Sequence, residues 1–183
     1  KNKMKILGEK SLSSKVEFTL EILFLIITLV DIAALGVCGI TIMLESARYN
    51  FFEQYLFQFI SVIIVLVVFL TTGIVALYII GKFIKIFNNL KNNKLFEDEN
   101  AKCLNKIFIA SIVIGILYFI ILIGINMFSK NFLSWMGMGE KLLLNLLILV
   151  FATGFVVFGT GIKILNEIYI KAIQYKEEND LTI

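Results

Sequence analysis

Four long apolar stretches constrain the fold of this chain more than any other feature. They cover residues 22–44, 56–80, 107–127 and 142–165. An α-helix of ~20 residues crosses the ~30 Å hydrocarbon core of a membrane, so each stretch is long enough to span one. Of the 183 residues, 59% are hydrophobic and only 17% are charged, whereas soluble domains carry about 25% charged residues. The sequence predicts an all-α integral membrane protein, one domain over residues 1–183, with four transmembrane helices in the lipid bilayer.

One polar connector, residues 81–106, separates the second apolar stretch from the third. It holds six of the 17 basic residues, the N-terminal segment holds five, and the C-terminal side holds three. The two loops at the opposite ends of the stretches hold the other three. Lys and Arg near span ends are retained in the cytoplasm. We therefore expect both termini and the connector to be cytoplasmic (N-in/C-in).

The cytoplasmic segments also have helical character. The second stretch is followed by apolar residues at three- and four-residue spacing: Phe83, Ile84, Phe87 and Leu90. This pattern predicts an amphipathic extension of the second helix. Three acidic residues after Phe96 predict that the third helix starts there, because acids favour the positive end of the helix dipole. The fourth helix continues through Ile168 and Tyr175 into the tail, residues 166–183.

The composition argues against catalysis. The chain has no His and no Pro, and its two Cys lie in different segments, Cys38 in the first stretch and Cys103 in the connector. Without His it lacks the usual general base and the commonest metal ligand. No Ser/His/Asp set, metal-ligand spacing or phosphate loop occurs. We expect no enzyme activity, no metal and no cofactor. A net charge of +3 with the bases at span ends also indicates no direct binding of nucleic acid.

Asp31 is the outstanding polar residue of the apolar stretches. It lies nine residues into the first stretch, ~14 Å from its start and near the bilayer midplane. An ionised acid there costs ~2.5–3.5 kcal/mol, so it should face other helices. Polar residues at similar depth are Tyr118, Thr153, Thr71 and Thr72, and none is basic. We expect Asp31 to be protonated and bonded to hydroxyls. A structural clamp, a proton or ion site, and a ligand contact remain open.

Three amides lie near the outer ends of their stretches: Gln58, Asn126 and Asn145. Together they could line an outward-facing polar pocket. The alternative is that they form ordinary hydrogen bonds between helices near the headgroups.

The connector and the tail carry a resemblance to a known family. The connector sequence KLFEDENAKCLNKI is similar to the pattern "small residue–PF–x–x–EN–x–K–x–L–x–x–I" of a bacterial family of four-span membrane proteins, catalogued only as a domain of unknown function. The tail sequence EENDLTI resembles the acidic ending of that family. The matching residues are Lys94, Phe96, Glu99, Asn100, Lys102, Leu104 and Ile107, then Glu178, Asp180, Leu181, Thr182 and Ile183. Leu95 stands where the family commonly has Pro.

The resemblance implies a role. Genes of that family commonly sit beside one for a small Cro-like helix-turn-helix regulator. This implies a sensor or regulator in the bacterial cytoplasmic membrane with a cytoplasmic protein partner. The basic connector and the acidic tail could form the partner surface: Lys91, Lys94, Phe96, Glu99, Asn100, Lys102, Glu178, Asp180 and Leu181. The alternative is a small transporter or a bacteriocin- or toxin-immunity membrane protein. Either could act as a homo-oligomer.

Overall fold

The fold is entirely helical over the part of the chain that the computed structural model describes, residues 11–48, 56–132 and 138–180. Its four helices are α1 (Leu12–Arg48), α2 (Leu56–Lys91), α3 (Asp98–Phe132) and α4 (Met138–Asp180). Each contains one of the four predicted apolar stretches. The predicted extensions of the second, third and fourth stretches are also helical. The all-α prediction is therefore confirmed.

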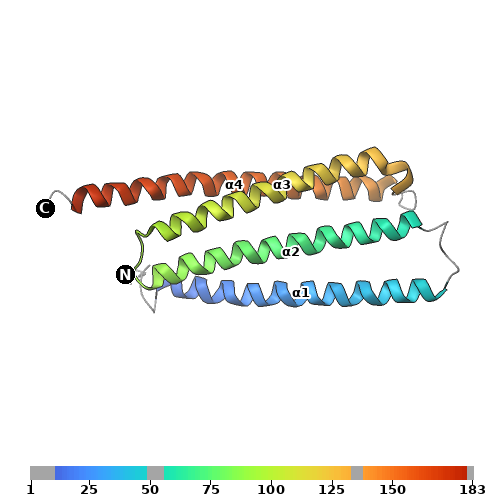
Figure 1. The fold of residues 1–183 in the computed structure, drawn as a ribbon, viewed down its shortest axis with the longest axis horizontal. Helices are drawn as coiled ribbons and strands as arrows, with labels where there is room; N and C mark the ends of the chain where they lie inside the picture. The colour runs from blue at the N-terminus through green and yellow to red at the C-terminus, as the bar shows by residue number, and fades with distance from the viewer. Residues whose placement is uncertain (1–10, 49–55, 133–137, 181–183) are drawn as a thin grey trace.

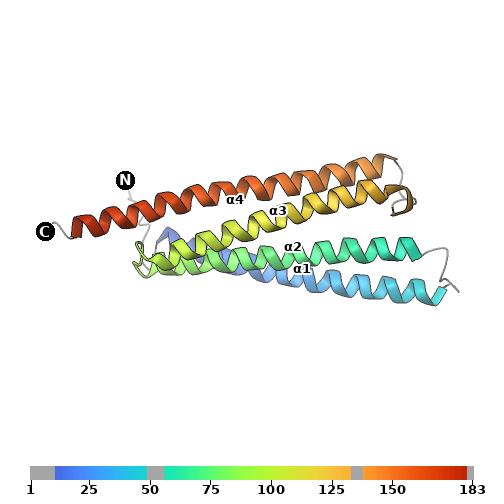
Figure 2. The same cartoon turned by 45° about the horizontal axis from the view of Figure 1, so that its top comes forward.

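The helices lie side by side in chain order, each antiparallel to the next (Figure 1). α1 packs on α2, α2 packs on α3, and α3 packs most extensively on α4. In both Figure 1 and Figure 2 the carboxyl end of α4 projects past the α2–α3 connector. The connector and the end of α4 therefore occupy the same end of the molecule.

Three of the helices are long and apolar enough to cross a membrane within the described residues. The segments are Leu66–Lys91, Asp98–Gly124 and Lys141–Asp180. α4 has 43 residues and is ~65 Å long at 1.5 Å per residue, about twice the thickness of a hydrocarbon core. A membrane-spanning α4 therefore extends well into water, which agrees with the exposed, charged residues at its carboxyl end.

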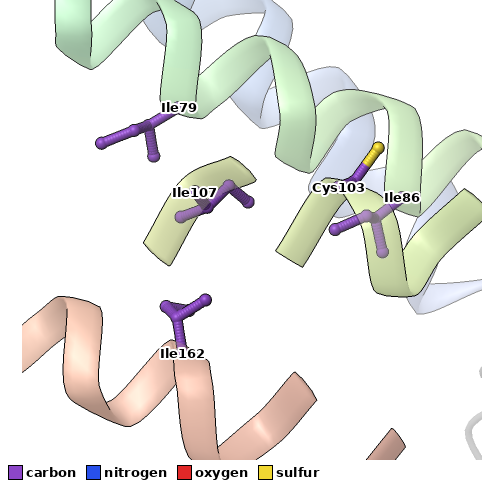
Figure 3. Close-up of a cluster of buried hydrophobic side chains, with 5 residues drawn as sticks. All are labelled: Ile79, Ile86, Cys103, Ile107 and Ile162. Carbon is purple, nitrogen blue, oxygen red and sulfur yellow. The ribbon is translucent and has the colours of Figure 1, made fainter. Parts of the chain in front are cut away.

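The core is built mainly around α3. One cluster of buried residues joins three helices near the connector: Ile79 and Ile86 of α2, Cys103 and Ile107 of α3, and Ile162 of α4. Figure 3 shows these side chains converging from the three helices. A second cluster lies further along α3 and α4: Ile114, Tyr118, Ile148 and Ala152. Many large apolar side chains of α1 and α4 are exposed, as expected for surfaces that face lipid.

Gly115 allows the close approach of α3 to α4. A Cβ atom at this position would lie 2.8 Å from Cγ2 of Val156 and 3.1 Å from the carbonyl oxygen of Ala152. Small residues at such contacts let helix backbones pack closely in membranes. This contact lies within the second cluster, beside Ile114 and Ala152, where α3 and α4 approach each other closely.

Candidate functional site

Most of the connector (residues 81–106) is helical, and its residues 92–97 form a tight, hydrogen-bonded turn between α2 and α3. Asn93 has a left-handed backbone conformation, with φ of 62°. The amide of Asn93 donates to the carbonyl oxygen of Leu90 over 3.1 Å, and the amide of Lys94 donates to that of Asn89 over 2.8 Å. This pair of bonds is a Schellman motif, which satisfies the last carbonyl groups of a helix. Asn tolerates the left-handed conformation better than most residues.

Asn100 links this turn to α2. Its side chain is completely buried, with 0% exposure, in the first turn of α3. Its Oδ1 accepts a 2.8 Å hydrogen bond from Nδ2 of Asn89, and its Nδ2 donates over 3.0 Å to the carbonyl oxygen of Lys94. A buried amide that satisfies both its donor and acceptor groups specifies one local geometry. Asn100 therefore holds the connector against the end of α2.

Tyr169 extends the same network to α4. Nδ2 of Asn100 donates to the hydroxyl oxygen of Tyr169 over 2.9 Å. That hydroxyl in turn donates to the carbonyl oxygen of Leu95 in the connector. Through Asn89, Asn100 and Tyr169, the polar network joins α2, α3 and α4 at the connector end of the protein. We call these three residues the polar junction.

Phe96 lies on the surface next to the polar junction, because it directly follows Leu95, whose carbonyl oxygen accepts a hydrogen bond from Tyr169. Its side chain is 39% exposed, and Nζ of Lys176 of α4 lies 5.5 Å from the centroid of its ring. A cation over an aromatic face is attracted by the ring quadrupole. The connector and the tail therefore do meet, and a Lys of the tail makes the contact with the connector.

The charged residues of the expected partner surface are distributed as follows. Lys91 pairs with Glu17 of α1 at 3.3 Å, Lys94 pairs with Glu97 at 3.2 Å, and Glu99 pairs with Lys85 of α2 at 2.7 Å. Lys102 is exposed on the second turn of α3, and Glu178 and Asp180 are exposed at the end of α4. Leu181 lies outside the described residues. Several of the expected surface charges are thus engaged within the protein.

Asn100 departs from the sequence expectation. It was expected on the partner surface, but its complete burial excludes direct contact with a partner in this conformation. The physical reason is the polar junction, which gives the Asn100 amide enough partners to be buried without loss of hydrogen bonds. Asn100 instead holds Lys94 and Leu95 of the connector in place through hydrogen bonds to their carbonyl oxygens.

Of the polar residues expected near the bilayer midplane, the structure brings Thr72 and Tyr118 together. Their hydroxyl oxygens are 2.5 Å apart and link α2 to α3. The Tyr118 ring stacks on Phe151 and Phe155 of α4. Thr71 and Thr153 are exposed, and among the described residues their hydroxyl groups bond to carbonyl groups of their own helices. Hydroxyl-to-carbonyl bonds of this kind are the local alternative to contacts between helices.

Asp31 lies against α2 at Gly73. A Cβ atom at Gly73 would overlap the carboxyl group of Asp31, so the carboxyl group occupies the space that a larger residue would fill. Asp31 is partly buried and lies near the middle of α1. Gly73 directly follows Thr72, so Asp31 lies close to the level of the Thr72–Tyr118 bond. Asp31 is on the α1 side of α2, whereas Thr72 faces α3.

Two of the three outer amides are bonded to each other. Nδ2 of Asn145 donates to Oδ1 of Asn126 over 3.1 Å, and Nδ2 of Asn126 donates to the carbonyl oxygen of Leu122 over 2.8 Å. This link joins α3 to α4. The side chain of Gln58 lies outside the described residues. Among those residues, no group of three or more His, Cys, Asp or Glu is placed to hold a metal ion.

Sequence reasoning did not single out Asn89, Lys85 or Tyr169. Both Asn89 and Lys85 lie in the predicted amphipathic extension of the second stretch, and Lys85 was counted only among the six basic residues of the connector. Tyr169 is separated from Ile162, Asn166 and Ile173 by seven, three and four residues, so the helical spacing places all four on one face of α4. The other three side chains on this face are buried. A polar residue on a buried helix face usually has a hydrogen-bond partner.

The comparisons with known proteins give one match. Residues 32–183 match the model of a family described as "Protein of unknown function (DUF2975)". This confirms the resemblance to a family of unknown function. No curated protein and no solved structure matches the chain.

Proposed function

The chain belongs to the DUF2975 family of proteins of unknown function, and from this premise we propose a non-enzymatic regulatory role. In this proposal the chain is a multi-pass protein of the bacterial cytoplasmic membrane. It binds a small helix-turn-helix regulator at its connector end. Binding depends on the arrangement of the membrane helices.

The proposed topology has four spans, with α1 as the fourth span and both termini in the cytoplasm. The distribution of basic residues supports this orientation, because the N-terminal segment, the connector and the C-terminal side hold all but three of the 17. α1 has 37 residues, more than enough to cross a hydrocarbon core of ~30 Å. The connector and the end of α4 then share the cytoplasmic side.

The observation that carries the proposal is the position of Phe96 above the polar junction. Its ring is exposed between the connector and Lys176 of α4. Asn100 and Tyr169 hold the connector beneath it. Aromatic side chains, Phe among them, are enriched in protein interfaces relative to the rest of the surface. A partner that binds Phe96 and Lys176 contacts both the connector and α4.

The polar junction supplies the coupling that a regulator needs. A shift of α4 relative to α3 would separate Tyr169 from Asn100 and change the shape of the surface that carries Phe96. A partner that prefers one of two such arrangements shifts the equilibrium between them by its difference in affinity. The same linkage makes the membrane helices respond to the partner.

The test is co-purification with a defined partner. The tagged full-length chain is co-expressed with the small helix-turn-helix protein encoded beside its gene. We expect Phe96→Ser to reduce recovery of that protein at least fivefold. The matched control is Phe18→Ser, because Phe18 of α1 is also an exposed Phe, at 64%, and lies outside the proposed surface. Equal recovery with both variants, or no helix-turn-helix gene beside this one, would contradict the proposal.

One observation favours a second candidate, a small transporter. Asp31 lies at the α1–α2 contact, near the middle of both helices. Carboxylates in membrane spans often mark proton or ion pathways. In proteoliposomes with an imposed pH gradient, a transporter would move protons or another ion, and Asp31→Asn would abolish that flux. The regulator proposal predicts no flux above that of empty vesicles.

A further inference from the structure

Lysines gather along one side of the contact between α2 and α3, where the apolar parts of both helices end. On α2, Tyr78, Lys82 and Lys85 are separated by four and three residues, so they lie on one face. On α3, Glu99, Lys102 and Lys106 are separated by three and four residues and also share a face. Lys85, Lys102 and Lys106 are exposed, and Lys82 is partly exposed.

The two faces lie on the same side of the molecule. Nζ of Lys85 pairs with Oε1 of Glu99 at 2.7 Å, which joins the α2 face to the α3 face. Register follows from two further contacts between the antiparallel helices, Asn89 with Asn100 and Thr72 with Tyr118. Interpolation between these contacts places Lys82 at the level of residues 107–108. Lys82 and Lys106 therefore flank the α2–α3 contact at nearly the same level.

Lys85 is neutralised by Glu99, whereas among the described residues no acidic side chain forms an ion pair with Lys82 or Lys106. Nζ of Lys82 lies 5.0 Å from the centroid of the Tyr78 ring. Tyr78 lies one helical turn before Lys82, toward the apolar part of α2, and its side chain is 44% exposed. Tyr at such a position is typical of the interface between headgroups and acyl chains.

Next to these lysines, toward the middle of both helices, the same faces become apolar. Ile74 of α2 is four residues before Tyr78, and Val113 and Leu117 of α3 follow Lys106 by seven and eleven residues. All three side chains are exposed. A ligand here would meet two lysines and a Tyr at one end and an apolar strip at the other. The surface is amphipathic along its length.

We propose that this surface binds one anionic phospholipid. Lys82 and Lys106 contact the headgroup phosphate, and an acyl chain lies along Ile74, Val113 and Leu117. Basic sites between transmembrane helices at the cytoplasmic side bind acidic headgroups. The adjoining apolar strip favours a lipid over a soluble phosphate compound, because the acyl chain of a lipid can lie along the strip while its headgroup contacts the lysines, and a soluble phosphate compound has no such apolar part. This inference requires that α2 and α3 cross a membrane and is independent of the regulator proposal.

The experiment measures lipid binding to the full-length protein by native mass spectrometry in detergent. Phosphatidylglycerol, phosphatidylcholine with the same acyl chains, and inorganic phosphate are titrated separately. We expect one phosphatidylglycerol to bind at least tenfold more tightly than phosphatidylcholine, and inorganic phosphate not to bind. The double variant Lys82→Gln/Lys106→Gln should lose roughly tenfold or more in affinity, since each Lys contributes to attraction of an acidic lipid.

The matched control is Lys163→Gln/Lys171→Gln, which removes the same charge from α4. Its affinity should fall less than twofold. The variant Lys82→Arg/Lys106→Arg keeps both charges and should retain binding. If Lys82→Gln/Lys106→Gln does not fold, the single variant Lys106→Gln replaces it and should also bind phosphatidylglycerol more weakly than the wild type. If both double Gln variants lost the same affinity for phosphatidylglycerol, the effect would come from net charge alone, and the proposed site would be wrong. Equal affinity of the wild type for the two lipids would also overturn it, and so would tight binding of inorganic phosphate.

Discussion

The side-chain amide of Asn100 donates a hydrogen bond over 2.9 Å to the hydroxyl oxygen of Tyr169, a residue 69 positions later in the chain. The same hydroxyl donates to the carbonyl oxygen of Leu95. Separating the connector from α4 would therefore break both of these hydrogen bonds. At this end of the protein, they link the first turn of α3 to the carboxyl half of α4.

Tyr169→Phe should loosen the connector without changing the packing of the ring. The substitution removes the hydroxyl that bonds both Asn100 and the carbonyl oxygen of Leu95, and leaves that carbonyl oxygen only a long 3.5 Å bond from Nδ2 of Asn100. We expect a cost of about 1–3 kcal/mol. We expect a lower thermal unfolding temperature and faster hydrogen exchange at residues 93–97. Tyr175→Phe is the control, because Tyr175 is 65% exposed on the same helix. Similar exchange in both variants would show that the hydroxyl bond is unimportant.

Asn100→Ala should be more costly than Tyr169→Phe. It removes one of the two acceptors of the Asn89 amide and the donor to Lys94, and it leaves a small cavity. We expect a loss of about 2–4 kcal/mol in the free energy of unfolding. SDS titration in mixed micelles measures this quantity. Asn92→Ala removes an exposed amide bonded to Asn88 and should change it by less than about 0.5 kcal/mol.

A double-mutant cycle tests whether Asn100 and Tyr169 act as a unit. Because they share a hydrogen bond, the losses for Asn100→Ala and Tyr169→Phe should not add, and the coupling energy should be about 0.5–3 kcal/mol. The three variants are compared by the same SDS titration. Strictly additive losses would show that the two residues stabilise the connector independently.

The helical extensions of α2, α3 and α4 beyond their apolar stretches could be predicted from the sequence, and the acids after Phe96 mark the start of α3. The start of α1 at Leu12, ten residues before its apolar stretch, was not predicted. The burial of Asn100 carried no local signal. An Asn in a charged connector is normally exposed. One of its partners, Tyr169 of α4, lies 69 positions later in the chain, and no local pattern relates the two.

For Asp31 the sequence predicted the depth but not the direction. Counting along the apolar stretches placed it level with Thr71 and Thr72, and Gly73 is the next residue. Which face of α2 it meets could not be predicted, because a helix that is apolar nearly all round has no periodicity to mark its faces. A Gly within such a helix permits close contact, but the partner residue is not encoded locally.

Gly73→Ala should destabilise the α1–α2 contact because the new methyl group overlaps the carboxyl group of Asp31. We expect a loss of about 1–3 kcal/mol in the free energy of unfolding, measured by SDS titration. In the Asp31→Ala background the same change should cost less, because the methyl group then has room. Gly81→Ala is the control on α2, with nothing within 4 Å of the added Cβ. It should be neutral or stabilising by up to about 1 kcal/mol.

Single cysteines should report the proposed orientation, after Cys38 and Cys103 are replaced by Ala. An impermeant thiol reagent on intact cells should label Ser46→Cys and Gly139→Cys, which follow the proposed first and third spans on the outer side. Lys15→Cys and Asn92→Cys should react only after the cells are permeabilised, because the basic segments that contain them remain in the cytoplasm. The inverse pattern would place Phe96 outside the cell. Labelling of Lys15→Cys and Ser46→Cys on the same side would show that α1 does not cross the membrane.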